Sequence, residues 1–348
     1  MGKTTNFLRQ ALRHVRLARA LEGGMRAHRS MEEEFKDRLL TLTSASMALE
    51  FPFRDLSAAK YFESNIFSIL FLSIFLSLGL PAPRVRAYGL ILHSLRGVVT
   101  STDNILDQES KGAIRIQGAR GCVLPNVMLL LLQSGLLYDV LNELAPDPRY
   151  RVLVQGQIIA ALQAIASEEE EEEHEINEVL DPDELLDRIH RYRGGRLLEL
   201  AFVAPVELEM ERAEDLRAAS AAVHRIGLGL QILDDITDLA LDMQSRNHNI
   251  LRSWIVHRGP DGPITDAELQ ILPCADLKRP WETFPGATHA VLEQATGESR
   301  AGFMALGQLG FPIDQEGIDD LLGWLFRARG LRDLWMLRTD GTMPKSAR

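Results

Sequence analysis

The sequence has little cysteine, little lysine and no strand-like pattern. Its two cysteines among 348 residues, Cys122 and Cys274, match neither a CxxC pair nor a zinc-ligand spacing. We therefore expect no disulfide framework and a reducing, cytoplasmic location. Six of the 38 basic residues are lysine, so arginine would build most of any anion-binding site. Runs of Val and Ile that alternate with polar residues between tight turns are missing, which favours an all-α fold.

An excess of acidic residues excludes one large class of partners. The chain carries 49 acidic and 38 basic residues, a net charge of −11. Proteins that bind duplex nucleic acid gain affinity by neutralising phosphates, so we expect no nucleic-acid partner. Hydrophobic residues make up 46% and charged residues 25% of the chain. These values exclude wholesale disorder and allow one or two domains with a real core.

Basic residues gather at the start of the chain. Seven Lys or Arg residues stand in residues 1–30 against one acidic residue, Glu22, while apolar residues recur at helical spacing. This pattern predicts an amphipathic helix, which either packs one side on the body of the protein or makes weak peripheral contact with an anionic membrane surface. We therefore divide the chain into a basic N-terminal segment, residues 1–45, and a helical domain, residues 46–348.

Residues 64–80 form the most apolar stretch and contain no charged residue. Seventeen residues are at the short limit for crossing a bilayer, and several are polar, so we interpret the stretch as a buried central helix rather than a membrane span. Five prolines in residues 258–290 predict a long irregular connection. Other helices are predicted over residues 85–106, 123–144, 151–178, 182–209, 213–242, 293–309 and 318–337.

Two groups of aspartates follow apolar helical stretches. Asp103 and Asp107 are one helical turn apart, and so are Asp234 and Asp238, with Asp235 between them in the sequence. Carboxylates on an apolar helix face repel one another and need a cation between them. Oxygen ligands without His or Cys suit Mg²⁺, which commonly bridges protein carboxylates to substrate phosphates. A solvated helix end remains the alternative for each group, but the two groups together favour a magnesium site.

The segment from Gly227 to Asp238 resembles the second Asp-rich motif of the trans-polyprenyl diphosphate synthases and related class I isoprenoid enzymes, with Gln231 in the glutamine position of that motif. The resemblance covers residues 55–245. It implies the isoprenoid synthase fold, a single large helical bundle around a central substrate cavity. It also implies three Mg²⁺ ions at the diphosphate of a prenyl substrate, held by Asp103, Asp107, Asp234, Asp235 and Asp238. All of these except Asp235 are the expected catalytic residues.

The same resemblance implies a set of substrate-binding side chains. Arg193 stands where the family has the Lys of a Lys-Thr-Gly segment. In the segments where the family binds isopentenyl diphosphate, positive charge remains although the residue identities differ. Asn104 departs from the family by replacing the second Asp of the first motif. The expected substrate-binding residues are Lys60, Arg96, Lys111, Arg115, Arg193 and Gln231.

Three functions stay open, and two of them are enzymes that use a prenyl diphosphate, as a transferase or a lyase. The altered isopentenyl diphosphate segments slightly favour a terpene synthase, which ionises an allylic diphosphate and then cyclises the product or eliminates a proton. Asn249, Ser253 and His257 weakly echo the Asn-Ser-Glu metal motif of such enzymes. The alternatives are a chain-elongating polyprenyl diphosphate synthase and a non-catalytic partner subunit of such a synthase. The family resemblance also implies a homodimer.

Overall fold

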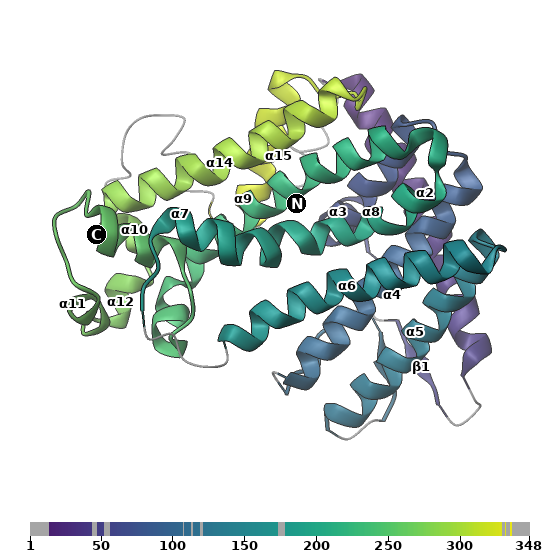
Figure 1. Ribbon diagram of the computed structural model, residues 1–348, viewed down its shortest axis with the longest axis horizontal. Coiled ribbons are helices and arrows are strands. Elements are labelled where there is room, and N and C mark those ends of the chain that lie inside the picture. Colours follow the sequence, from purple (N-terminus) through teal and green to yellow (C-terminus); the bar gives the residue numbers. More distant parts are fainter. Residues whose placement is uncertain are drawn as a thin grey trace. The chain divides into compact units, whose positions relative to one another are not determined.

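Most described residues lie in helices and very few lie in strands (Figure 1), which confirms the all-α prediction. One small departure is an antiparallel pair of two-residue strands, β1 (Leu49–Glu50) and β2 (Arg115–Ile116), with Leu49 opposite Ile116. Two-residue strands are too short to produce an alternating sequence pattern, so they could not be predicted from such a pattern. The computed structural model describes residues 14–43, 47–51, 56–106, 108–112, 114–118, 121–172, 178–328, 331 and 335.

The chain forms two compact units. The boundaries between them fall inside α6 (Pro148–Glu172), α8 (Leu197–Leu208) and α9 (Ala213–Ser245). A short helical turn, η2 (Met210–Arg212), precedes α9. The first unit comprises Met1–Ile158, Leu200–Arg217 and Leu309–Pro312, and the second comprises Ile159–Glu199, Ala218–Gln308 and Ile313–Arg348.

The first unit is a bundle in which α2 packs on its neighbours along one side. Leu21, Met31 and other apolar residues at helical spacing are buried on α2, which contacts α3 and α4. A side chain at Gly24 would overlap the backbone of α3 at Ile69, so the two helices approach closely. The described part of the basic N-terminal helix therefore packs on the body of the protein, which was one of its two interpretations. Residues 1–13 lie outside the described residues. The helices of this bundle are α2 (Val15–Leu42), α3 (Ala58–Ser77), α4 (Ala82–Leu106) and α5 (Val123–Leu144) (Figure 1).

Helix α3 is the central helix of this bundle. Both α3 and α5 are long and apolar enough to cross a membrane by length and composition, which is weak evidence for a span. In α3, however, 61% of the most apolar stretch is buried inside the protein, and Ile69 and Phe75 are fully enclosed. The ring of Phe202, from α8, lies 5.1 Å from that of Phe75. The prediction of a buried helix over residues 64–80 is therefore confirmed.

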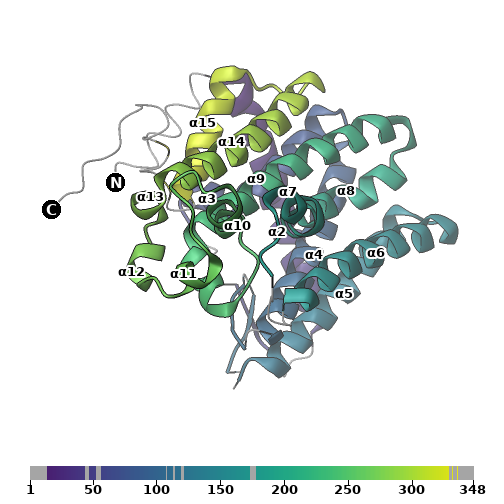
Figure 2. The same ribbon diagram turned by 60° about the vertical axis from the view of Figure 1, so that its left-hand side comes forward.

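Helices of the second unit pack on α14 (Pro285–Gln308). α10 (Ile250–Arg258), α13 (Pro280–Thr283) and α15 (Gln315–Ala328) all contact it, and α15 runs beside it in both views (Figures 1 and 2). Gly229 of α9 also lies against α14, because a Cβ there would come within 2.5 Å of the carbonyl oxygen of Ala295. Small residues thus let α9 and α14 pack backbone to backbone.

The predicted irregular connection over residues 258–290 was wrong in part. It contains two further short helices, α11 (Asp266–Gln270) and α12 (Cys274–Leu277), as well as α13, and α14 begins at Pro285 instead of at residue 293. Prolines start both α13 and α14, since their fixed φ suits a helix and the first helical N–H needs no partner. Treating each proline only as a helix breaker caused the error.

Candidate functional site

Two glycine-containing segments that the sequence singled out touch each other in the second unit. α7 (Pro182–Leu185) continues into η1 (Leu186–Arg196), a π-helix with wider turns than an α-helix, and η1 carries Gly194. A Cβ on Gly194 would lie 2.5 Å from the carbonyl oxygen of Gly227 on α9, and a Cβ on Gly227 would overlap that of Gly194. These glycines therefore allow η1 to lie directly against the start of the second Asp-rich motif.

Asp235 is buried, and protein groups occupy both of its carboxylate oxygens. Oδ1 accepts a hydrogen bond from Nε2 of Gln231 at 3.1 Å. Oδ2 accepts from the backbone N–H of Ile250 at 2.6 Å and lies 2.7 Å from Nε2 of His190. Asp235 thereby joins η1, α9 and α10, and it has 2% of its surface exposed. These contacts fit a positioning role for Asp235 and Gln231 better than direct contact with a ligand.

Asp234 and Asp238 are more accessible than Asp235. They lie one turn apart on α9, Asp234 half-buried and Asp238 exposed. The Thr237 hydroxyl donates to the carbonyl oxygen of Asp234 at 2.8 Å and lies 3.2 Å from Oδ1 of Asp238. Two accessible carboxylates at this spacing are an oxygen-only donor set, which fits Mg²⁺ with its retained waters.

In the first Asp-rich motif, Asn104 has a structural role. Its amide nitrogen donates to the carbonyl oxygen of Lys111 at 2.6 Å and to Oδ1 of Asn126 at 3.1 Å. Its amide oxygen accepts from the backbone N–H of Lys111 at 3.0 Å. Asn104 is 2% exposed and so ties the loop after α4 to α5. Asp103, one residue earlier, is exposed in the last turn of α4, and Asp107 lies outside the described residues.

The remaining predicted substrate-binding residues are mostly on the surface. Lys60 is exposed in the first turn of α3, where Ser57 caps the helix. Lys111 is exposed and forms an ion pair with Glu109, and Arg115 is exposed on β2. Arg193 belongs to η1, but its side chain lies outside the described residues.

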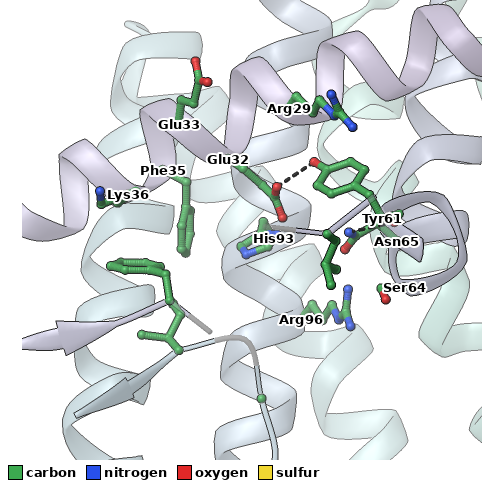
Figure 3. A pocket seen from close by; sticks show the side chains of 14 residues that line it. Arg29, Glu32, Glu33, Phe35, Lys36, Tyr61, Ser64, Asn65, His93 and Arg96 are labelled. Carbon is green, nitrogen blue, oxygen red and sulfur yellow. Dashed lines mark hydrogen bonds between the residues drawn. The ribbon is translucent and has the colours of Figure 1, made fainter. Parts of the chain in front are cut away.

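A pocket of about 510 Å³ opens in the first unit (Figure 3). The pocket is bordered by the three segments in which the family resemblance predicts binding of isopentenyl diphosphate. Tyr61 lines it next to Lys60, Arg96 lines it from α4, and Gly112 and Ile114 line it within the segment that runs from Lys111 to Arg115. The middle of α2 was not part of that prediction, yet it contributes most of the charge: Arg29, Glu32, Glu33 and Lys36.

Partial or full burial shifts the pKa values of several ionisable groups in and beside this pocket. Water reaches Arg96, but protein surrounds it on most sides and lowers its pKa, an effect that Glu32 opposes. Dehydration also raises the pKa of Glu32, whose Oε2 accepts a hydrogen bond from the Tyr61 hydroxyl at 2.6 Å. Burial lowers the pKa of His28 to about 3, helped by the nearby His93 and Arg96. Burial likewise lowers the pKa of His93 to about 3, so both imidazoles are neutral at pH 7.

The sequence reasoning missed Arg29, Glu32 and His93 as site residues. One signal was present, because His28 and Glu32 lie one turn apart on the side of the amphipathic helix that carries Leu21, Met31 and Phe35. Polar residues on the apolar side of a helix have to find buried partners.

The weak echo of a terpene synthase metal motif is explained by contacts within the protein. Asn249 caps α10, accepting from the N–H of Arg252, and donates to Oδ2 of Asp242 at 2.7 Å. Ser253 donates to the carbonyl oxygen of Leu180 at 2.5 Å, and Nε2 of His257 lies 2.7 Å from that of Val179. These side chains hold α10 against the segment before α7.

The chain matches no family model and no curated protein by sequence. Its fold is similar to that of a decaprenyl diphosphate synthase from Rhodobacter capsulatus, with a TM-score of 0.55 and 18% identity over 90% of this chain and 98% of that one. A geranylgeranyl pyrophosphate synthetase from the archaeon Geoglobus acetivorans gives a TM-score of 0.54 and 13% identity, over 91% and 99%. An octaprenyl pyrophosphate synthase from Helicobacter pylori gives a TM-score of 0.54 and 12% identity, over 85% and 98%.

These similarities span nearly the full length of each solved structure. The sequence identities are low, so the comparisons establish the fold alone. They agree with the helical content and with the resemblance of the second Asp-rich motif. The chain therefore has the all-helical isoprenoid synthase fold, in the form found in the polyprenyl diphosphate synthases.

Proposed function

We propose that this chain is a chain-elongating prenyltransferase, which joins isopentenyl diphosphate to an allylic prenyl diphosphate. One observation carries the proposal: the pocket of the first unit gathers the three segments that the family uses for isopentenyl diphosphate. Ionisation alone needs no second diphosphate site. The slight preference for a terpene synthase is therefore not confirmed, and the similar solved structures, all polyprenyl diphosphate synthases, also favour elongation.

The pocket has the charge and size for a small diphosphate. Three basic side chains, Arg29, Lys36 and Arg96, line it against two acidic ones, Glu32 and Glu33. Arginine forks bind phosphate oxygens through charge-assisted hydrogen bonds, which are about twice as strong as neutral ones. The reduced hydration of Arg96 favours an anionic partner further. Lys60, Lys111 and Arg115, on the bordering segments, add positive charge at the entrance in this proposal.

The allylic substrate is assigned to the Asp-rich motifs. Asp234 and Asp238 present accessible oxygens that fit Mg²⁺, and Asp103 and Asp107 are the carboxylates that the first motif supplies. When bound, Mg²⁺ supplies Lewis-acid stabilisation of the leaving diphosphate. Asp235 holds α9 in place through its hydrogen bonds to Ile250 and His190, and so helps to position Asp234 and Asp238 in this proposal. Arg193 adds a charge-assisted bond to the same diphosphate in this proposal.

The proposed reaction breaks the allylic C–O bond and forms a C–C bond to the terminal alkene carbon of isopentenyl diphosphate. It releases one diphosphate and one proton and leaves a prenyl diphosphate that is one five-carbon unit longer. Basic side chains must hold two diphosphates so that the two carbons meet, which is catalysis by positioning and by preorganised charge.

We also propose that the enzyme is a cytoplasmic homodimer. α5 and α6 expose large apolar side chains, including Leu124 at 70%, Leu131 at 57% and Val152 at 68%. Large apolar side chains left exposed on neighbouring parts of the chain are what an interface between two copies would cover. A weak peripheral membrane contact remains a proposal for the basic N-terminal residues.

Replacing Arg96 tests the proposed isopentenyl diphosphate site. Arg96→Ala should raise the KM for isopentenyl diphosphate by about 10- to 100-fold, because a hydrogen bond to a charged group contributes about 1.5–3 kcal/mol. The KM for the allylic substrate should change little. Arg149→Ala, which alters an exposed arginine paired with Asp147, is the matched control.

An unchanged KM for isopentenyl diphosphate in Arg96→Ala would contradict the assignment. If no product forms but diphosphate still binds, the partner-subunit function becomes the better proposal.

A further inference from the structure

A cluster of metal-ligand side chains lies at the wall of the pocket, on the side of α2 and α4. One imidazole nitrogen of His28, one of His93 and one carboxylate oxygen of Glu32 lie within 4.8 Å of one another. His28 and Glu32 are one turn apart on α2, and His93 comes from α4, which α2 contacts. Figure 3 shows the Glu32 carboxylate close to the His93 ring. The cluster shares no residue with the Asp-rich motifs.

The two imidazoles are buried and incompletely satisfied. His28 is fully buried and His93 is 8% exposed. Within the part of the chain that the structure describes, Nε2 of His28 and Nδ1 of His93 have no hydrogen-bond partner. Buried polar side-chain atoms nearly always have one. Two unsatisfied nitrogens in one cluster therefore point to a bound species that completes them.

The hydrogen bonds of Tyr61 decide which nitrogen of His28 carries the proton. Its hydroxyl donates to Oε2 of Glu32 at 2.6 Å and lies 2.6 Å from Nδ1 of His28. A hydroxyl has one proton to donate, so Nδ1 of His28 must carry its own proton and donate it to the Tyr61 oxygen. In a neutral imidazole the other nitrogen, Nε2, then has a lone pair. The unsatisfied atom of His28 can therefore accept a hydrogen bond or bind a metal ion.

We propose that His28, Glu32 and His93 bind a divalent transition-metal ion of the Zn²⁺ class. Two imidazoles and one carboxylate are a common ligand set for Zn²⁺, whereas Mg²⁺ prefers oxygen ligands. Zinc bonds of about 2.0–2.2 Å place tetrahedral ligand atoms roughly 3.3 Å apart, so the separations in the cluster must shrink by at most roughly 1.5 Å. Rotation of three side chains can supply this contraction.

The surroundings of the cluster suit an ion. Tyr61 holds Glu32 and His28 in place, the kind of outer hydrogen bond that orients metal ligands. The pocket gives the ion a path from solvent, and three protein ligands leave one coordination position for water. Glu32 supplies the negative charge that a dication needs. The inference does not rest on the proposed function, because it concerns a different metal and different ligands.

The test uses untagged, chelator-treated full-length protein with excess Mg²⁺, so that the Asp-rich motifs do not take up the probe. Titration with ZnCl₂ by calorimetry should show one site, and CoCl₂ should give the visible absorption of low-coordinate Co²⁺. His93→Gln and Glu32→Gln should each weaken Zn²⁺ binding by at least tenfold. Glu33→Gln, which changes an acid of the same pocket outside the cluster, should leave the affinity unchanged.

Several results would overturn the proposal. One is the absence of a Zn²⁺ site in the parent protein, which would leave buried water as the partner of the two nitrogens. Another is an affinity of His93→Gln equal to that of the parent. X-ray absorption of the Zn²⁺-loaded parent gives an answer even if the variants fail to fold. Scattering from two imidazoles is expected, and a spectrum without imidazole scattering would assign the ion to another site.

Discussion

Asn104 has a structural role at the position where the resembling family has the second Asp of its first motif. Its amide nitrogen faces two acceptors, the carbonyl oxygen of Lys111 and Oδ1 of Asn126, while its oxygen faces the N–H of Lys111. An aspartate in this position has no donor for those acceptors when it is ionised. The family pattern identifies the position, but only the packed structure reveals that the amide binds the loop after α4.

Asn104→Asp should therefore destabilise the protein by about 1–3 kcal/mol, the cost of leaving buried acceptors unsatisfied. Urea unfolding followed by circular dichroism measures this change. Asn142→Asp is the matched control, because Asn142 is exposed and its amide oxygen accepts a hydrogen bond from Arg151. Equal stability of Asn104→Asp and the parent would contradict the structural role of Asn104.

Neighbouring aspartates of the second motif should behave in opposite ways. Asp235→Ala leaves the N–H of Ile250 and the ring of His190 buried without their acceptor, so we expect a loss of about 3 kcal/mol or more. Asp234 is half-buried, and Asp234→Ala should cost less stability than Asp235→Ala while abolishing Mg²⁺-dependent turnover. Unfolding curves and product assays on the same two variants make the comparison. Loss of folding in Asp234→Ala with a stable Asp235→Ala would reverse the assignment.

At the scale of helices, the contact between η1 and α9 depends on the absence of side chains. A methyl group on Gly227 would overlap the carbonyl oxygen of Gly194, which is backbone and cannot rotate away. Gly227→Ala should therefore cost about 1–3 kcal/mol in spite of the higher helix propensity of alanine.

Gly156 provides the control for this prediction. It lies in α6 with open space around its Cα, so Gly156→Ala should be neutral or stabilising by up to about 1 kcal/mol. Thermal unfolding of the two variants separates overpacking from propensity. A Gly227→Ala protein as stable as Gly156→Ala would show that η1 and α9 are not in contact.

Sequence patterns predicted the helices well where apolar periodicity was strong. The helix over residues 123–144 has the predicted ends, and the buried helix over residues 64–80 lies within and just beyond α3. Patterns failed at Pro285, where a proline begins a helix. They also missed the part of the pocket that Glu32 and His93 form, because these residues meet only through the packing of α2 on α4. Contacts between distant segments are a property of the tertiary structure.

At the scale of the whole molecule, the N-terminal helix is part of the first unit rather than an appendage. α2 buries Leu21 and Phe35 against the bundle, and its charged residues between Arg29 and Lys36 line the pocket. The same helix therefore serves stability and, in our proposal, substrate binding. The basic residues of this segment left a membrane contact open beside packing on the body, and the buried side of α2 shows that its described part packs on the bundle.

The most direct test of chain elongation is product analysis of the full-length protein. It should be incubated with Mg²⁺ and allylic diphosphates of increasing length, with and without labelled isopentenyl diphosphate. Both longer prenyl diphosphates and hexane-soluble hydrocarbons should be measured. Chain elongation predicts that the label enters longer diphosphates and that such products need both substrates. Hydrocarbon or alcohol formed from an allylic diphosphate alone, with no labelled diphosphate product, would contradict it and establish the terpene synthase reaction instead.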